Sequence, residues 1–207
     1  NLLRAFLEDF NPQFCFNLHD QRTIFGVEGT KNPATISFLA PSEEETRAIT
    51  KGRIQTMNVI VAMNAFLQKI IPGFVGRYTD EFYPTATGDN FQKLGFNTIL
   101  IESGHFPDDY QREIAREHTF YAILQGLYHV ATSNDFNDYE PYFKIPNNAK
   151  IFYDVIHRYS NSKQDVAYQY KDEIINDQLV SKLNKVDQKD LKMKFGHNEI
   201  VFESKKY

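Results

Sequence analysis

The chain has 207 residues, of which 42% are hydrophobic and 24% charged, and its formal net charge is −4. These values are typical of a globular protein with one sizeable core and room for a small appended module. The negative balance argues against a general nucleic-acid binder, which normally presents a basic face. No apolar stretch is long enough to span a bilayer, so we expect no membrane partner. Cys15 is the only cysteine, which excludes an intrachain disulfide and slightly favours a cytoplasmic location.

The first predicted element is a helix that ends before Asn11-Pro12. Its apolar residues recur at helical spacing: Leu2, Leu3, Ala5, Phe6, Leu7 and Phe10. Only Asn1 could cap this helix and no Met precedes it. We therefore expect the chain to begin inside or at the edge of a helix of a longer protein. The alternative is that processing made this start and that nothing essential is missing.

Two strands and a long helix are predicted next. Residues 13–18 and 34–39 are apolar runs with strand character, and the second run ends at Ala40-Pro41. Ser42, followed by Glu45 three residues later, has the pattern of a helix start. That helix is predicted to continue to about Ile71, where Pro72-Gly73 ends it.

The next segment, 74–96, is rich in Gly, Pro, Asp, Asn and Tyr. It is predicted to be a long, mostly irregular loop with a short helical turn near 89–94, and loops of this length are usually functional. Residues 97–102 form a third predicted strand. A strong amphipathic helix is predicted from 108 to about 131, with an expected apolar face of Ile114, Phe120, Ile123, Leu124 and Leu127.

The remainder divides into a predicted linker, 133–146, and a small β-rich module, 147–207. The linker is rich in Asn, Asp, Tyr and Pro. Short β segments are expected at 150–158, 165–170, 179–186 and 199–202. The first 132 residues therefore form the predicted main unit, in the α/β class.

Two apolar runs end in groups that can bind a metal or move a proton. The run Phe14-Cys15-Phe16-Asn17-Leu18 ends at His19, and the run Thr98-Ile99-Leu100-Ile101 ends at Glu102. Open α/β sheets place their sites at such strand ends. A neutral imidazole is a good zinc ligand, and a carboxylate ending a buried strand has a raised pKa that suits a general base. Taken singly, ordinary structural roles are the more frequent alternative for both residues.

Other side chains could contact a substrate. Arg22 could bind a carboxylate, since a guanidinium group matches its shape, although a structural ion pair is the usual role of a single arginine. Tyr78 and Tyr83 lie in the long loop, where a mobile phenol could cover a substrate, although packing is the default for any tyrosine. The sequence contains no phosphate-binding Gly-rich loop, no G-x-S-x-G elbow, no C-x-x-C pair and no H-E-x-x-H motif.

Together, these segments resemble the carboxypeptidase A-like zinc metallocarboxypeptidases. Residues 16–19 (Phe-Asn-Leu-His) resemble the strand that carries the family's third zinc ligand, and 99–102 (Ile-Leu-Ile-Glu) resemble the strand of its catalytic Glu. The segments 76–80 (Gly-Arg-Tyr-Thr-Asp), 88–92 (Gly-Asp-Asn-Phe-Gln) and 102–106 (Glu-Ser-Gly-His-Phe) are similar to a bacterial branch. The resemblance covers roughly the first 130 residues and implies part of a mixed-sheet zinc-peptidase (phosphorylase/hydrolase-like) fold.

The resemblance implies a role for individual residues. His19 would be the third zinc ligand, and Glu102 the general base that later donates a proton to the leaving amine. Tyr83, with Tyr78 as the alternative, would be the mobile tyrosine over the substrate. Where many relatives have Ser-Tyr after the ligand His, this chain has Asp20-Gln21, which puts the local loop and the specificity pocket in question.

The family's remaining groups have no counterpart here. In that family an H-x-x-E motif, an oxyanion Arg and an Asn-Arg pair for the substrate carboxylate precede the third-ligand strand. Residues 1–18 of this chain contain no H-x-x-E motif and no match to the oxyanion Arg or the Asn-Arg pair. A catalytic zinc needs three protein ligands. The expectation is a zinc carboxypeptidase that acts on peptides in an intact protein, while this chain alone is inactive and holds zinc weakly or not at all. A zinc amidohydrolase of N-acyl amino acids and a non-catalytic family member are the alternatives.

Overall fold

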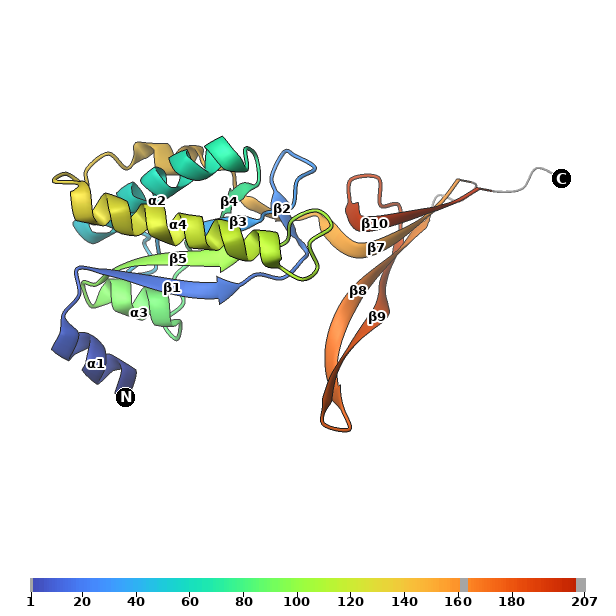
Figure 1. The fold of residues 1–207 in the computed structure, drawn as a ribbon, viewed down its shortest axis with the longest axis horizontal. Coiled ribbons are helices and arrows are strands. Elements are labelled where there is room, and N and C mark those ends of the chain that lie inside the picture. The colour runs from blue at the N-terminus through green and yellow to red at the C-terminus, as the bar shows by residue number, and fades with distance from the viewer. Residues whose placement is uncertain (1, 161–163, 204–207) are drawn as a thin grey trace.

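The computed structural model describes residues 2–160 and 164–203. The chain forms an α/β unit built on a mixed four-stranded sheet. A second mixed four-stranded sheet follows it in the C-terminal part of the chain (Figure 1). The α/β class predicted from the sequence is confirmed. Helix and strand order along the chain matches the predicted order, from the first helix through the strand that ends at Glu102 to the last long helix.

The central sheet has the strand order β1-β5-β3-β4. Its strands are β1 (Phe14–Asp20), β5 (Asn97–Ser103), β3 (Ile36–Leu39) and β4 (Val75–Arg77). Strands β1 and β5 are parallel, β5 and β3 are antiparallel, and β3 and β4 are parallel. The two strands predicted to carry functional residues are therefore neighbours that end at the same edge of the sheet.

Helices cover both faces of this sheet. Helices α2 (Lys51–Ile70) and α4 (Glu113–Thr132) pack together on one face, where most of the hydrophobic core lies (Figure 1). Gly126 allows α4 to approach closely, since a Cβ there would lie 3.0 Å from both Phe16 and Met63. The short helix α3 (Thr87–Lys93) lies against the opposite face, near Asn17.

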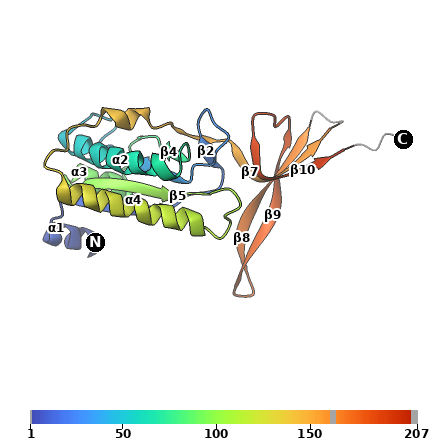
Figure 2. The same ribbon diagram turned by 45° about the horizontal axis from the view of Figure 1, so that its top comes forward.

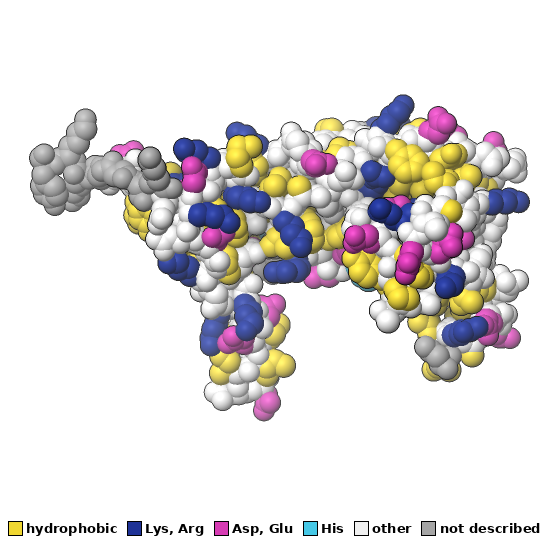
Figure 3. All heavy atoms as spheres, turned by 180° about the vertical axis from the view of Figure 1, so that it is seen from behind, with side chains coloured by type: hydrophobic (Ala, Val, Ile, Leu, Met, Phe, Trp, Pro, Cys, Tyr) yellow, Lys and Arg dark blue, Asp and Glu magenta, His cyan; other side chains and the backbone are white. Residues whose placement is uncertain are grey.

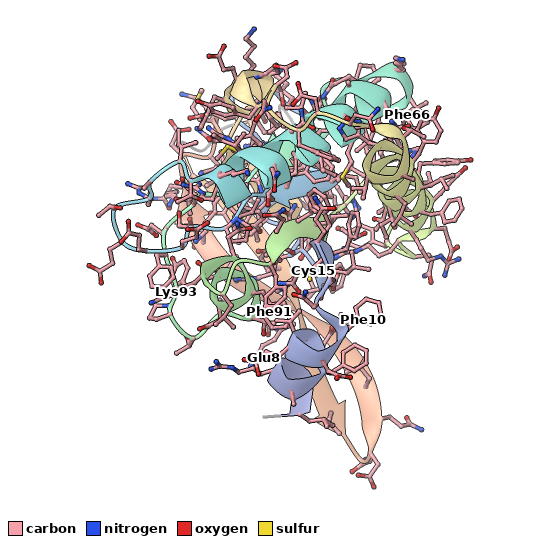
Figure 4. All side chains as sticks on the ribbon, turned by 90° about the vertical axis from the view of Figure 1, so that its left-hand side faces the viewer. Glu8, Phe10, Cys15, Phe66, Phe91 and Lys93 are labelled. Carbon is pink, nitrogen blue, oxygen red and sulfur yellow. The ribbon has the colours of Figure 1, made fainter. Side chains whose placement is uncertain are left out.

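Helix α1 (Leu2–Phe10) is confirmed, but only Leu7 of its apolar residues is buried. The exposed large side chains on it are Leu2, Leu3, Phe6 and Phe10. Figure 4 shows α1 standing away from the rest of the α/β unit, with the Phe10 ring on its outer side. The helical period of the sequence thus corresponds to an apolar stripe on which Leu7 is buried and most of the other large side chains are exposed.

The long helix α4 differs from the prediction in its start and in its buried face. It begins at Glu113 rather than near 108, because Asp109 caps it by accepting hydrogen bonds from the Glu113 and Ala115 amides. Its buried residues are the small ones: Ala115, Ala122 and Gly126. Four of the residues predicted to face the core are instead exposed: Ile114, Phe120, Leu124 and Leu127. Small residues face α2 because the two helices approach closely.

Helix α2 also starts later than predicted. Ser42 does not cap it; the Ser42 hydroxyl donates to the Asp80 carbonyl instead, at 2.6 Å. The N-cap is Thr50, whose side chain accepts from the Arg53 amide. Residues 42–49 form a loop that packs against the buried Arg53, and the predicted end of the helix near Ile71 is correct.

The segment 133–146 is not a free linker. It contains a 3-10 helix, η1 (Glu140–Lys144), and its Tyr142 and Ile145 are buried in the main core. Strand β6 (Asn148–Lys150) then pairs antiparallel with β2 (Phe25–Val27). The α/β unit therefore extends to about residue 150, because these aromatic and apolar residues complete its core.

The C-terminal module is a sheet of order β10-β7-β8-β9. Its strands are β7 (Phe152–Tyr159), β8 (Asp165–Ile175), β9 (Gln178–Lys189) and β10 (Phe195–Phe202). The predicted β segments are confirmed, and β8 and β9 are longer than expected. Their hairpin extends as a narrow arm beyond the rest of the module (Figure 2). Among the described residues, no helix has the length and apolar character needed to cross a membrane.

Candidate active site

The parallel pairing of β1 and β5 brings His19 and Glu102 side by side. The two residues are register partners at the carboxyl ends of their strands. The Nδ1 atom of His19 lies 3.8 Å from Oε1 of Glu102, and the side chains are 46% and 14% exposed, respectively. The two residues singled out in the sequence thus meet at one sheet edge, with the imidazole open to solvent and the carboxylate half-buried.

Asn17 orients the imidazole of His19. It lies two residues earlier on β1, hence on the same face of the sheet, and its Oδ1 is 3.1 Å from Nε2 of His19. An amide oxygen only accepts hydrogen bonds, so Nε2 is the donor in this contact. Nδ1 is the ring nitrogen on the Glu102 side, and in a neutral ring it is the nitrogen that could bind a metal.

The environment of Glu102 favours its neutral form. Burial raises the pKa of Glu102 above its ordinary value, the nearby His19 lowers this pKa, and the Asp20 carboxylate raises it. Burial is the largest of these effects, because a desolvated carboxylate loses its hydration. A carboxyl group whose pKa is moved toward neutrality suits proton transfer near pH 7.

Arg112 clamps the two strand ends together. Its guanidinium group donates to Oδ1 of Asp20 at 2.8 Å and to the carbonyls of Gln21, Ser103 and Gly104 at 3.0 Å each. Arg112 adopts a left-handed backbone conformation, with φ 61°, at the start of α4. Since these bonds join the residues that follow His19 and Glu102, Arg112 has a positioning role and its charge is not free for a substrate.

Gly104 makes the turn after Glu102 possible. A Cβ at this position would lie 2.0 Å from the Ala34 carbonyl oxygen and 2.7 Å from Nε2 of Gln21. We expect Gly104→Ala to lower the free energy of unfolding by about 3 kcal/mol, because backbone must shift to accommodate the methyl group. Urea unfolding would measure this.

Gly95→Ala is the control, since a Cβ there meets no atom within 4 Å and the cost is only that of its positive φ, about 1 kcal/mol. Equal losses for the two variants would contradict the steric argument for Gly104.

Tyr78 rather than Tyr83 lies close to Glu102. Burial raises the pKa of Tyr78 strongly, and the charge of Glu102 raises it further, while Asn148 and Arg22 lower it. The Tyr83 side chain is exposed, and its hydroxyl donates to Oε2 of Glu81 at 2.9 Å. Tyr83 is the tyrosine that the sequence favours over the substrate, with Tyr78 as the alternative; both line one hollow, and Tyr78 is the one whose pKa the charge of Glu102 affects.

Two hollows lie beside these residues. The first, of about 700 Å³, is lined by Tyr78 and Tyr83 among others. The second, of about 420 Å³, is lined by Asp20, Arg22 and Arg112, together with residues of the arm. Arg22 is exposed and makes no hydrogen bond or ion pair with the described residues, so its guanidinium group is available to an anion.

No group of three or more His, Cys, Asp or Glu side chains with the arrangement of a metal site occurs among residues 2–160 and 164–203. A catalytic zinc requires three protein ligands, and His19 could supply one of them through Nδ1.

Comparison with known proteins gives no relative: no family model, no curated protein and no solved structure matches the chain. Any functional interpretation therefore depends on the arrangement of the side chains. Two residues of that arrangement escaped the sequence analysis. The two-residue period of β1 could have indicated Asn17, because it shares a face with His19. Asn148 is 46 residues from Glu102 in sequence, and no local signal connects them.

Proposed function

We propose that this chain is part of a zinc-dependent carboxypeptidase, with Glu102 as the general base and His19 as one metal ligand. The observation that supports the proposal is the juxtaposition of His19, whose Nε2 is hydrogen-bonded to Asn17, with the half-buried Glu102, 3.8 Å apart at the carboxyl ends of two parallel strands. The remaining ligands would come from polypeptide outside these 207 residues.

Glu102 would move the proton during hydrolysis. It would accept a proton from the attacking water as the water oxygen bonds to the carbonyl carbon of the last peptide bond. It would then return that proton to the nitrogen as the carbon–nitrogen bond breaks, which releases a free amine and a carboxylate. Burial raises the pKa of Glu102, which makes its carboxylate a stronger base for the first of these two steps. A bound zinc would supply a polarised water and a Lewis acid.

Neighbouring side chains would orient the substrate. Tyr78 lies beside Glu102 and lines the larger hollow, so its phenol is placed to contact the terminal residue of a peptide. Arg22 would attract a carboxylate on the other side. Arg112 would hold the strand ends in register and thereby keep His19 and Glu102 at a working distance.

The test is the zinc content of the longer protein that contains this chain. We expect about one zinc per chain, and we expect His19→Ala to reduce zinc affinity at least tenfold by removing one of three ligands. His118→Ala, on α4, is the control and should retain zinc. Metal analysis after dialysis against a weak chelator would measure both variants.

Substrate comparison then separates the possible activities. Release of single residues from the carboxyl end of peptides supports the proposal. Faster hydrolysis of N-acyl amino acids than of peptides would overturn it in favour of an amidohydrolase with the same His19 and Glu102. A full-length protein with neither zinc nor hydrolysis would overturn both and indicate a binding protein.

A further inference from the structure

The arm of the C-terminal module has two chemically different faces. The arm is the part of the β8–β9 hairpin between residues 169 and 184, and it stands beyond the carboxyl end of β1 (Figures 1 and 2). Residues that are paired across an antiparallel hairpin share a face. One face therefore holds the pairs Tyr170–Leu183, Asp172–Ser181 and Ile174–Leu179.

This face is apolar at both ends and exposed. Ile174 is 78% and Leu179 is 73% exposed. The opposite face is charged, and Glu173 forms ion pairs there with Lys171 and Lys182 at 3.4 and 3.1 Å. The charges on this face are paired within the hairpin, so they need no partner from elsewhere. The apolar face has no cover among the described residues.

The apolar face is turned toward the candidate active site. Tyr170, Asp172 and Ser181 line the hollow of about 420 Å³ whose other wall includes Asp20 and Arg22. Asp20 directly follows His19 on β1. Seen from behind, the arm projects from the molecule with hydrophobic atoms along the side nearer the α/β unit (Figure 3). The hollow thus connects the arm with the sheet edge that carries His19.

Buried polar contacts fix the arm at its base. Asp154, on β7, accepts hydrogen bonds from the Tyr170 amide at 2.7 Å and from Nε2 of Gln169 at 2.9 Å. The module is itself attached to the α/β unit, since Nε2 of His197 bonds the Thr23 carbonyl at 2.8 Å and the His197 ring lies 4.0 Å from the His105 ring, measured between ring centroids. The arm therefore keeps a defined place in front of the strand ends.

We propose that the apolar face of the arm binds the peptide substrate upstream of the cleaved bond and selects apolar side chains there. The inference rests on the proposed function. An extended peptide, like the arm, returns to the same face every two residues, about 7 Å. The apolar pairs Tyr170–Leu183 and Ile174–Leu179 are separated by the pair Asp172–Ser181, so they would meet peptide side chains that are four residues apart. The occupant is a peptide because this face of the arm continues into the hollow, where Asp172 and Ser181 offer polar contacts to a peptide backbone.

The experiment compares two double variants in the full-length protein. Ile174→Ser with Leu179→Ser alters the apolar face. Ile175→Ser with Val180→Ser is the control on the opposite face of the same two strands. Two peptides with the same terminal residue serve as probes, one with leucines and one with serines at alternate upstream positions. For the leucine peptide, we expect the apolar-face variant to lower kcat/KM about tenfold, mainly through KM.

The same variant should leave kcat/KM for the serine peptide within about twofold, and the control should change neither value. Equal losses for both peptides would overturn the inference while leaving carboxypeptidase activity intact. A change in sedimentation of the apolar-face variant, showing that this face joins two copies of the protein, would also overturn it. Unchanged kcat/KM of this variant for both peptides would overturn it too, since another part of the protein would then cover the arm.

A binding measurement keeps this test separate from the proposed function. Fluorescence anisotropy of labelled leucine peptide on the Glu102→Gln protein requires no hydrolysis. Weaker binding by the apolar-face variant but not by the control supports the inference, even if the protein hydrolyses nothing. No binding by any of the proteins overturns it.

Discussion

If Glu102 is the general base that we propose, Glu102→Gln should reduce kcat for peptide hydrolysis by about 10²- to 10⁴-fold while the zinc content of the full-length protein stays unchanged. The amide keeps the size of the side chain but cannot accept a proton from water. Since His19 would remain in place beside it, metal binding should persist. Steady-state kinetics together with metal analysis of the full-length protein would measure the two effects separately.

Activity and stability of the unmutated protein should respond to pH in opposite directions. The base must be ionised, so kcat/KM rises with pH through the raised pKa of Glu102. Burial raises this pKa in the folded state, so the folded protein binds more protons than the unfolded protein between the ordinary and the raised value. Folding stability contributed by Glu102 is therefore lost as pH rises through that interval. The Glu102→Gln variant has no ionisable group at this position, so it should not lose stability over this interval and should be at least as stable as the unmutated protein at neutral pH.

The control for the loss of activity in Glu102→Gln is Glu113→Gln. Glu113 is an exposed glutamate at the start of α4, where it pairs with Arg116, so the Glu113→Gln variant should have the kcat of the unmutated protein. A Glu102→Gln protein with full activity would exclude Glu102 as the base. A variant that lost zinc as well as activity would show instead that Glu102 supports the metal site.

Strand patterns predicted the meeting of His19 and Glu102 at one sheet edge better than helix patterns predicted the core. Buried strands such as β5 have a continuous apolar sequence, and the abrupt change at Glu102 marks where the strand leaves the core. The parallel pairing that joins β5 to β1 has no local signal, yet strand order and the strand-end rule sufficed to bring Glu102 near His19.

The apolar face of α4 was predicted wrongly for a physical reason. Large apolar residues at helical spacing favour a face toward the core, but α4 packs on α2 and Phe16 through Ala122 and Gly126. Close packing selects small side chains, which carry little weight in a hydrophobic pattern. Bulky residues such as Phe120 and Leu124 are then left on the outside.

The tyrosine beside Glu102 could not be chosen from the sequence, because both candidates lie in one irregular loop. A short strand decides between them: β4 ends at Arg77, directly before Tyr78, and its pairing with β3 carries Tyr78 to the sheet edge. The Tyr78 amide also donates to the Phe38 carbonyl at 2.9 Å. Tyr83 lies beyond this anchored part of the loop.

Asp80→Ala should lower the free energy of unfolding by about 3 kcal/mol, because it leaves a buried cation without its partner. Arg53 is 1% exposed at its side chain, and its Nη2 donates to Oδ2 of Asp80 at 2.8 Å. The lower end of the usual range applies because Asp80 is 31% exposed and solvent screens part of the attraction. Urea unfolding would measure the loss.

The Asp80 pair should also have a characteristic pH dependence. Burial raises the pKa of Asp80, but the hydrogen bond and charge of Arg53 outweigh burial and hold this pKa below its ordinary value. The stability that the pair contributes is therefore full above the ordinary carboxyl pKa and is lost as pH falls through the lowered one. The difference between the unmutated protein and Asp80→Ala should shrink over that acidic interval and stay constant near neutral pH.

Two further variants distinguish the buried pair from the surface contact of the same carboxylate. Arg47 is half exposed and reaches Oδ1 of Asp80 at 3.3 Å, so Arg47→Ala should cost less than about 1 kcal/mol. Arg53→Met combined with Asp80→Ala should recover part of the loss, since it removes the unpaired cation. If the double variant were as unstable as the sum of its single changes, Asp80 would act independently of Arg53.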